Sequence, residues 1–319
     1  GTAVAAAQPR VSASGRYVVF LTPAQLEPAD TNAVVDVYRF DRLSGTNLLV
    51  SRGATAANGG SSAPTISGDG SRVAFSSLAN NLVAGDTNAR SDVFVRDIAA
   101  GTTMRISTNV DAQPTTIDAR DPFISTDGLH VGYLLSSNVL TSEATASSDV
   151  YVARTDGSVI RGPLNGISEG TGTTEGAYDP TLSMFGRFLV FRSYAPTLAA
   201  GDTNGAADVF GRQIMADPLT PAFGAAQLLT TPSAGGTATG GTGFDSENPE
   251  IAGTGTFGTY QSGFTNLVPG DTNGMVDVFA RAGIFGNGEC DYIEATLSGY
   301  AAWLAQFGVD SCSDSGSPY

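Results

Sequence analysis

The segment Pro64-Thr-Ile-Ser-Gly-Asp-Gly70-Ser-Arg-Val-Ala-Phe75 decides the fold of this 319-residue chain, because variants of it return along the sequence. A short apolar stretch follows the proline, a glycine closes a turn, and a β-branched and aromatic run comes next. Self-similarity at a period of tens of residues indicates a repeat architecture. The five copies begin with Pro9-Arg-Val-Ser-Ala-Ser-Gly15, Pro64-Thr-Ile-Ser-Gly-Asp-Gly70, Pro122-Phe-Ile-Ser-Thr-Asp-Gly128, Pro180-Thr-Leu-Ser-Met-Phe-Gly186 and Pro249-Glu-Ile-Ala-Gly-Thr-Gly255.

A second signature follows the first in each copy. An Asp-Thr-Asn loop leads into a second aspartate, which is followed by valine and an aromatic residue. The third copy keeps only Glu143-Ala-Thr145 before Asp149-Val-Tyr151. The complete loops carry Asp30, Asn32 and Asp36; Asp86, Asn88 and Asp92; Asp202, Asn204 and Asp208; and Asp271, Asn273 and Asp277.

Each copy has the pattern of four short β-strands. In the second copy the apolar stretch after Pro64 is followed by runs at Arg72–Phe75, Asp92–Arg96 and Thr103–Ser107, separated by Gly, Asp and Asn turns. Short strands broken by such turns at regular intervals indicate an all-β protein. A period above 50 residues that holds four strands fits one blade of a β-propeller.

The ends of the chain suggest how the ring closes. The fifth copy has no convincing fourth strand after Val278–Ala280, and Thr2–Ala7 could supply it. We therefore predict a five-bladed β-propeller over residues 1–282, with four-stranded antiparallel blades closed by an N-terminal strand. Residues 283–319 would form a C-terminal helical tail. A sixth blade built from that tail is the alternative.

The pattern from Pro64 to Phe75 resembles the PD40 (TolB-like, WD40-like) β-propeller repeat. Its continuation, Asn81-Leu-Val-Ala-Gly-Asp-Thr-Asn88 followed by Asp92-Val-Phe-Val-Arg-Asp97, resembles repeats of secreted and surface proteins of bacteria. The resemblance covers about residues 9–281. It implies the fold, whereas propellers of this kind serve as scaffolds, binding modules and enzyme appendages.

Composition excludes several classes of function. The formal charge is −15, and all 16 basic residues are arginines. Without a basic face, neither nucleic acid nor an anionic membrane surface is an expected partner. One histidine and two cysteines exclude His/Cys metal catalysis. No apolar run approaches the ~20 residues that span a bilayer.

The Asp-Thr-Asn loops have two interpretations. Their carboxylates and amide oxygens, at Asp30, Asn32, Asp36 and the nine corresponding positions, are the hard oxygen ligands of calcium. The same residue types also cap turns by accepting backbone N–H groups, which makes each loop an Asx-turn. The sequence leaves calcium-loop and capped-turn readings open.

The tail has the signals of a stapled helix. Asp291 is an N-cap candidate with Glu294 three residues on, and Gly308 offers a C-terminal stop. Cys290 and Cys312 flank the helix, and we predict a disulfide between them. The apolar stripe includes the candidate partner-binding residues Tyr300, Trp303 and Phe307, which would dock on the propeller itself or on a neighbouring copy.

The sequence favours a non-catalytic secreted or cell-surface protein, in the periplasm or outside the cell, that acts as a structural or protein-interaction subunit. No catalytic residue is assigned. The first alternative is a polysaccharide-binding propeller that uses Tyr178 and Tyr194. The second is a glycoside hydrolase or lyase that uses Asp121, Asp179 or His130, although His130 occupies a position that we expect to face solvent.

Overall fold

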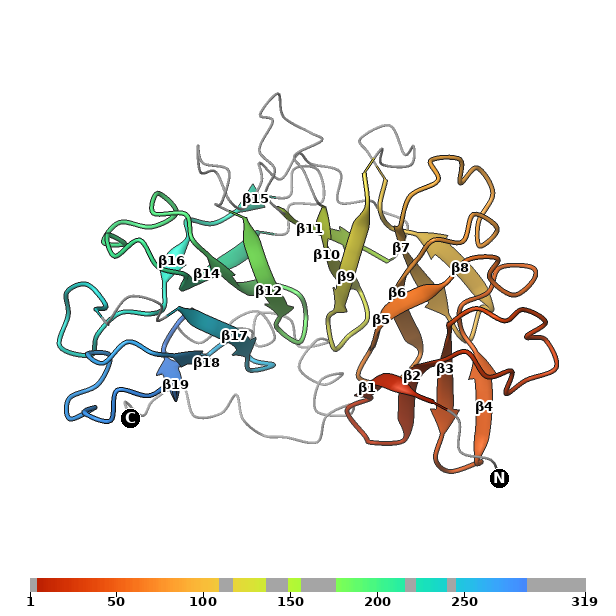
Figure 1. Ribbon diagram of the computed structural model, residues 1–319, viewed down its shortest axis with the longest axis horizontal. Helices are drawn as coiled ribbons and strands as arrows, with labels where there is room; N and C mark the ends of the chain where they lie inside the picture. Colours follow the sequence, from red (N-terminus) through yellow and green to blue (C-terminus); the bar gives the residue numbers. More distant parts are fainter. Residues whose placement is uncertain are drawn as a thin grey trace, which may run out of the picture.

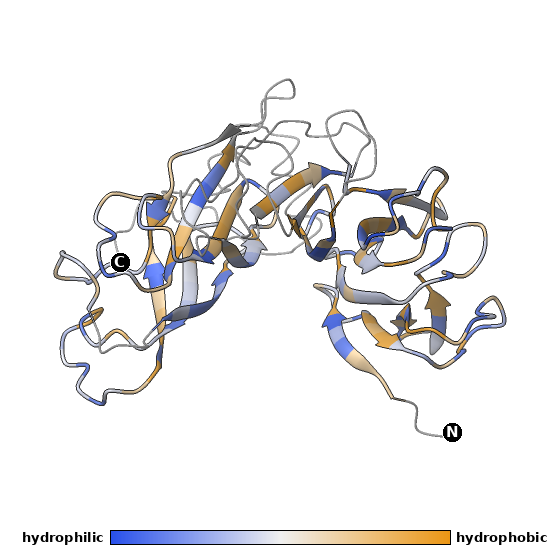
Figure 2. Ribbon diagram, turned by 45° about the horizontal axis from the view of Figure 1, so that its top comes forward, coloured by the Kyte–Doolittle hydropathy of each residue, from blue (hydrophilic) through white to orange (hydrophobic). Residues whose placement is uncertain are grey.

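The computed structural model describes residues 5–108, 117–135, 149–155, 176–215, 222–239 and 245–285. These residues form an all-β protein whose antiparallel sheets follow one another in chain order. Figures 1 and 2 show the sheets arranged in an arc, with the first and fifth sheets at its two ends. None of the described residues belongs to a helix, so none could span a membrane as one.

The sheets correspond to the five repeats. Each sheet takes its strands in sequence order, except that β14 pairs with both β15 and β16. The strands are β1 (Ala7–Val11), β2 (Tyr17–Thr22), β3 (Asp36–Asp41) and β4 (Thr46–Leu49); β5 (Ser61–Ile66), β6 (Arg72–Ser77), β7 (Asp92–Asp97) and β8 (Thr102–Arg105); β9 (Ala119–Ile124), β10 (His130–Leu135) and β11 (Asp149–Arg154); β12 (Ala177–Leu182), β13 (Phe188–Ser193), β14 (Asp208–Met215), β15 (Ala222–Phe223) and β16 (Gln227–Leu228); and β17 (Ser246–Ile251), β18 (Phe257–Ser262) and β19 (Asp277–Ala282).

The repeat proline lies inside the first strand of its sheet rather than before it. In β5, Ala63 precedes Pro64 and has a φ of 48°, and the register of β5 against β6 shifts between Ser62 and Thr65. A bulge of this kind leaves one residue out of the ladder, so a residue without an N–H is tolerated in the strand. The same positive φ recurs before the other repeat prolines, at Gln8, Asp121, Asp179 and Asn248.

Two aromatic rings stack inside each sheet, one from the second strand and one from the third. The third-strand ring comes from the Asp-Val-aromatic signature, and the centroids of each pair lie about 6 Å apart, within the range of favourable aromatic contacts. The pairs are Phe20–Tyr38, Phe75–Phe94, Tyr133–Tyr151, Phe191–Phe210 and Tyr260–Phe279. Figure 2 shows hydrophobic and hydrophilic residues alternating along the strands.

The junction between successive sheets also repeats. The valine after the second aspartate packs against the next sheet, and Val37, Val93, Val150 and Val209 are fully buried there. The turn of each sheet hydrogen-bonds to the turn of the next, as when the Ala13 N–H donates to the Gly68 carbonyl over 2.9 Å. The described residues thus contain four versions of one sheet-to-sheet contact.

The predicted closing strand needs a correction. Ala7, its last residue, lies in β1 of the first sheet, because its backbone is paired with Leu21 of β2. Ala5 and Ala6 are outside any strand, and Thr2–Val4 lie outside the described residues. In the described part of the chain the fifth sheet therefore has three strands.

Candidate functional site

The four Asp-Thr-Asn loops share one turn. In each, the side-chain oxygen of the asparagine accepts a hydrogen bond from the backbone amide two residues later, which is the geometry of an Asx-turn. The asparagine is thereby used as the turn cap that the sequence left open as an alternative. The bonds run from Val34 to Asn32 (2.8 Å), from Arg90 to Asn88 (2.9 Å), from Ala206 to Asn204 (2.9 Å) and from Met275 to Asn273 (2.7 Å).

The second aspartate of each of the first, second and fourth loops is buried where the third strand starts. A hydroxyl of the following strand or loop donates to its carboxylate: Ser51 to Asp36 at 2.6 Å, Ser107 to Asp92 at 2.5 Å, and Thr230 to Asp208. Burial raises the pKa of all three carboxyls, since desolvation penalises the charged form.

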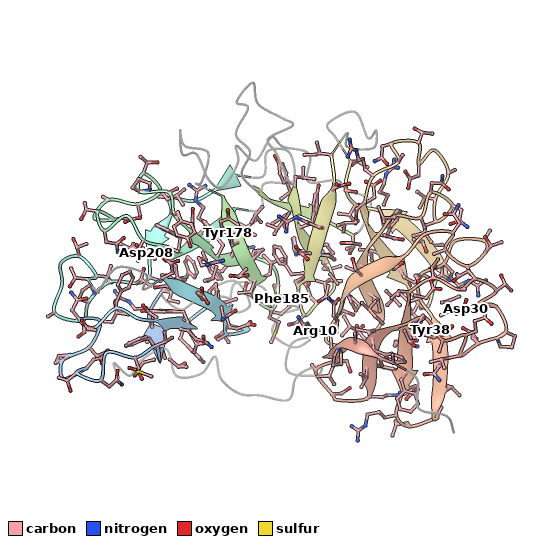
Figure 3. The ribbon with its side chains drawn as sticks, in the orientation of Figure 1. Arg10, Asp30, Tyr38, Tyr178, Phe185 and Asp208 are labelled. Atoms are coloured by element: carbon pink, nitrogen blue, oxygen red, sulfur yellow. The ribbon has the colours of Figure 1, made fainter. Side chains whose placement is uncertain are left out.

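The first aspartate is satisfied differently in the first and second loops. Asp30 accepts a hydrogen bond of 2.5 Å from the Tyr38 hydroxyl, and Figure 3 shows these two side chains together at one end of the molecule. In the second sheet Phe94 takes the position of Tyr38, so no tyrosine hydroxyl is available to Asp86. Instead the Arg105 guanidinium lies 3.6 Å from the Asp86 carboxylate. Both partners of this ion pair are buried.

The fourth loop has neither partner. Strand register places Phe210 where the first sheet has Tyr38, and Leu228 where the second has Arg105. Asp202 is 5% exposed, and neither of its carboxylate oxygens accepts a hydrogen bond of good geometry. One oxygen of the fully buried Asp208 is also without a hydrogen-bond partner.

The two carboxyl groups of this loop interact directly. Burial, the first cause, and the nearby charge of Asp202 together raise the pKa of Asp208 to about 7, although the Thr230 hydroxyl opposes the shift. The two carboxyl groups lie within hydrogen-bonding reach of each other. Burial also raises the pKa of Asp202, while the nearby Asn204 amide lowers it. Figure 3 places Asp208 on the opposite side of the arc from Asp30.

The remaining loops are less enclosed. In the fifth loop the Asn273 side chain donates to Asp277 over 2.9 Å, and Asp271 has one buried oxygen without a hydrogen-bond partner. Asp271 and Asp277 are both half-buried. Glu143 of the third loop lies outside the described residues. Within the described ranges no three His, Cys, Asp or Glu side chains gather at one point, so Asp202 and Asp208 act as a pair.

The acidic candidates near the inner strands have ionic partners. Asp121 lies 2.7 Å from Arg120, and Asp179 lies 3.1 Å from Arg192. Arg192 also stands over the Tyr178 ring, 5.1 Å from its centroid, and 6.0 Å from the centroid of Tyr194. The two tyrosines predicted to stack on sugars contact each other edge to face, with centroids 6.3 Å apart, and the Arg192 cation lies beside both rings.

His130 does not face solvent as expected. A Cβ atom on Gly186 would come within 2.6 Å of the His130 ring and Cβ, so the imidazole packs under the turn of the next sheet. The corresponding residue of the first sheet, Tyr17, lies in the same way under Gly70. The position is therefore part of the sheet-to-sheet junction, which the repeat alignment alone did not reveal.

The two ends of the arc expose positions that interior junctions bury. Val278, the counterpart of the four buried valines, is 73% exposed. Phe257, the counterpart of Tyr17 and His130, is 46% exposed. At the other end Val11 is 60% exposed, whereas its counterpart Ile66 is buried against the first sheet.

The predicted disulfide between Cys290 and Cys312 and the partner-binding residues Tyr300, Trp303 and Phe307 lie outside the described residues.

No family model and no curated protein matches this chain. Among solved structures, it is similar to TolB from Acinetobacter baumannii, with 14% identity, a TM-score of 0.41 and coverage of 83% of this chain and 53% of that chain. The chain thus spans about half of that protein. It is also similar to the β-propeller domain of the Trilobed protease from Pyrococcus furiosus, with 11% identity, a TM-score of 0.48 and coverage of 91% and 73%. An oligogalacturonate lyase from Vibrio parahaemolyticus has 9% identity, a TM-score of 0.46 and coverage of 88% and 68%. The structures similar to this chain are thus TolB-like and other β-propeller proteins, as the sequence repeat indicates.

Proposed function

We propose that this chain is a non-catalytic, secreted or cell-surface protein that associates head to tail with further copies as a structural subunit. The exposed end faces of the arc support this proposal. Phe257 and Val278 at the fifth sheet occupy positions that every interior sheet covers with its successor. Val11 at the first sheet occupies a position that the second sheet buries against its predecessor.

The four interior junctions serve as a template for the contact between copies. At each one, a valine and a residue under the turn of one sheet meet the turn and first strand of the next. The fifth sheet offers the first half of this contact and the first sheet offers the second half. Because the two halves are different surfaces, the association is heterologous and produces a ring or a filament.

A charge at Val278 tests this proposal. We expect Val278→Asp to abolish association, because an aspartate at the centre of the contact would be buried without a partner. The measurement is the mass of the protein by light scattering over a hundredfold range of concentration, together with negative-stain microscopy. Wild type should grow in mass and form rings of several copies or fibres, whereas the variant should remain a monomer.

Leu78→Asp is the matched control, since Leu78 is an exposed apolar residue that directly follows β6 and lies on neither the first nor the fifth sheet. It should associate like wild type. A wild-type mass equal to one chain at every concentration, with single closed rings in the microscope, would overturn the proposal.

Polysaccharide binding is the second candidate, and the cluster of Tyr178, Arg192 and Tyr194 supports it. Aromatic faces beside charged groups are suited to sugar rings that carry carboxylates. If this function holds, binding of monomeric protein to a panel of acidic polysaccharides should be detectable and should fall at least tenfold in Tyr178→Ala. Absence of binding by wild type removes this candidate.

The proposal of a non-catalytic role is supported by the pairing of Asp121 and Asp179 with arginines. Each carboxylate already has an ionic partner, and His130 is packed into a junction. Turnover of any polysaccharide by the wild-type protein would contradict this part of the proposal.

A further inference from the structure

We propose that the loop of the fourth sheet binds one calcium ion between the carboxylates of Asp202 and Asp208, and that the loops of the first and second sheets bind none. This inference does not depend on association between copies. It stands on two carboxylates that are at least nine-tenths buried and that face each other. Three of their four oxygens have no hydrogen-bond partner of good geometry.

A buried carboxylate needs a compensating donor or cation, because desolvation of an unpaired charge is costly. The fourth loop supplies one hydrogen bond of good geometry, from the Thr230 hydroxyl, and the weaker contacts of Asn204, for two buried carboxylates. A divalent cation neutralises both charges at once. Calcium accepts carboxylates, backbone carbonyls and water as ligands in flexible geometry, so backbone carbonyls and water would complete the coordination that the two aspartates begin.

The first two loops carry an internal substitute for the ion. In the first, the Tyr38 hydroxyl donates to Asp30 from the position that Phe210 takes in the fourth sheet. In the second, Arg105 places its guanidinium 3.6 Å from Asp86, from the position that Leu228 takes in the fourth sheet. A positive charge in this place opposes a cation by direct repulsion.

The fifth loop differs in exposure. Both of its aspartates are half-buried, although one oxygen of Asp271 is enclosed, and Asn273 already donates to Asp277. Among the complete loops, the fourth therefore combines enclosed carboxylates with a shortage of donors. The expected stoichiometry is one tightly held ion per chain.

The test is calorimetric titration of the EDTA-treated, dialysed protein with calcium chloride, combined with thermal melts. We expect one site per chain and a rise in Tm of roughly 5 °C at a hundredfold excess over Kd. Asp202→Asn should lower the affinity at least tenfold. Asp86→Asn, its counterpart in the second loop, should leave the titration unchanged.

Two further variants provide a sharper control. Each adds or removes the side chain that takes the place of the ion, and leaves the aspartates unchanged. Phe210→Tyr gives the fourth loop the hydroxyl of Tyr38, and we expect it to raise the Tm in EDTA and to remove most of the response to calcium. Arg105→Leu gives the second loop the character of the fourth, and we expect it to add a calcium response.

Several results would overturn the proposal. They are a melt and titration indifferent to calcium and EDTA, four sites of equal affinity, or an Asp86→Asn variant that loses as much affinity as Asp202→Asn. Equal binding of magnesium and calcium would replace calcium by a nonselective divalent site.

Discussion

Replacement of Phe94 by alanine should lower the free energy of unfolding by about 3–5 kcal/mol, the usual loss when a buried phenylalanine is truncated. Phe94 is fully buried and stacks on Phe75, with ring centroids 5.9 Å apart. It also belongs to the apolar cluster shared by the first and second sheets. Because the ring serves both its own sheet and the junction, the cavity should weaken two neighbouring sheets.

The measurement is a thermal melt followed by circular dichroism, in which the Tm should fall on the order of 10 °C. Met104→Ala is the matched control, because Met104 lies on the adjacent strand but is partly exposed to solvent. It should cost less than about 1 kcal/mol. A Phe94→Ala variant that melts with the control would show that the stacked pair does not support the junction.

The sequence was sufficient for the second and third strands of each copy and for their order. The aromatic run at Arg72–Phe75 became β6, and the run at Asp92–Arg96 became β7, extended by one residue. Both contain a short apolar run of β-branched and aromatic residues between turn signals, which indicates a strand. The first strand of the copy was expected only after Pro64, whereas β5 begins at Ser61, before the proline. A proline ordinarily excludes a central strand, and the bulge at Ala63 that tolerates it is a matter of backbone register.

The sequence located the Asp-Thr-Asn loops, but it did not distinguish the fourth loop from the first and second. Asp30, Asp86 and Asp202 stand in identical Asp-Thr-Asn motifs, so the motif alone gave all three the same two interpretations. What distinguishes them is a residue on another strand: Tyr38, Arg105, or neither. Alignment of the five Asp-Val-aromatic motifs would have revealed the change from tyrosine to phenylalanine, but its consequence depends on which carboxylate the ring edge reaches.

The junction between sheets was beyond sequence reasoning for a similar reason. The repeat shows that Gly70 and Gly186 close equivalent turns, which accounts for their positive φ. It does not show that Tyr17 and His130 of the preceding sheets lie directly beneath them. Contacts between successive repeats join residues some 50 positions apart, and these residues have no shared local pattern.

Replacement of Gly70 by alanine should destabilise the protein by about 2–4 kcal/mol, through two separable effects. The φ of Gly70 is 76°, in the left-handed region that costs an alanine roughly 1–2 kcal/mol. The new Cβ would also lie 2.2 Å from the Tyr17 ring, which must move. That ring supports Arg39, whose guanidinium stands 4.2 Å from the ring centroid and donates to the Gly70 carbonyl over 2.7 Å.

Gly45→Ala separates the backbone effect from the clash. Gly45 has a φ of 69°, and no atom lies within 4 Å of the Cβ that alanine would add, so only the conformational cost of about 1–2 kcal/mol should appear. Denaturant melts of the two variants should therefore differ by the cost of displacing Tyr17. Adding Tyr17→Ala to Gly70→Ala should cost less than the two single changes together, because the clash disappears with the ring. If the losses of unfolding free energy were strictly additive, the Tyr17 ring would move aside at no cost. The turn of the second sheet would then not pack tightly on the first sheet, contrary to the junction described above.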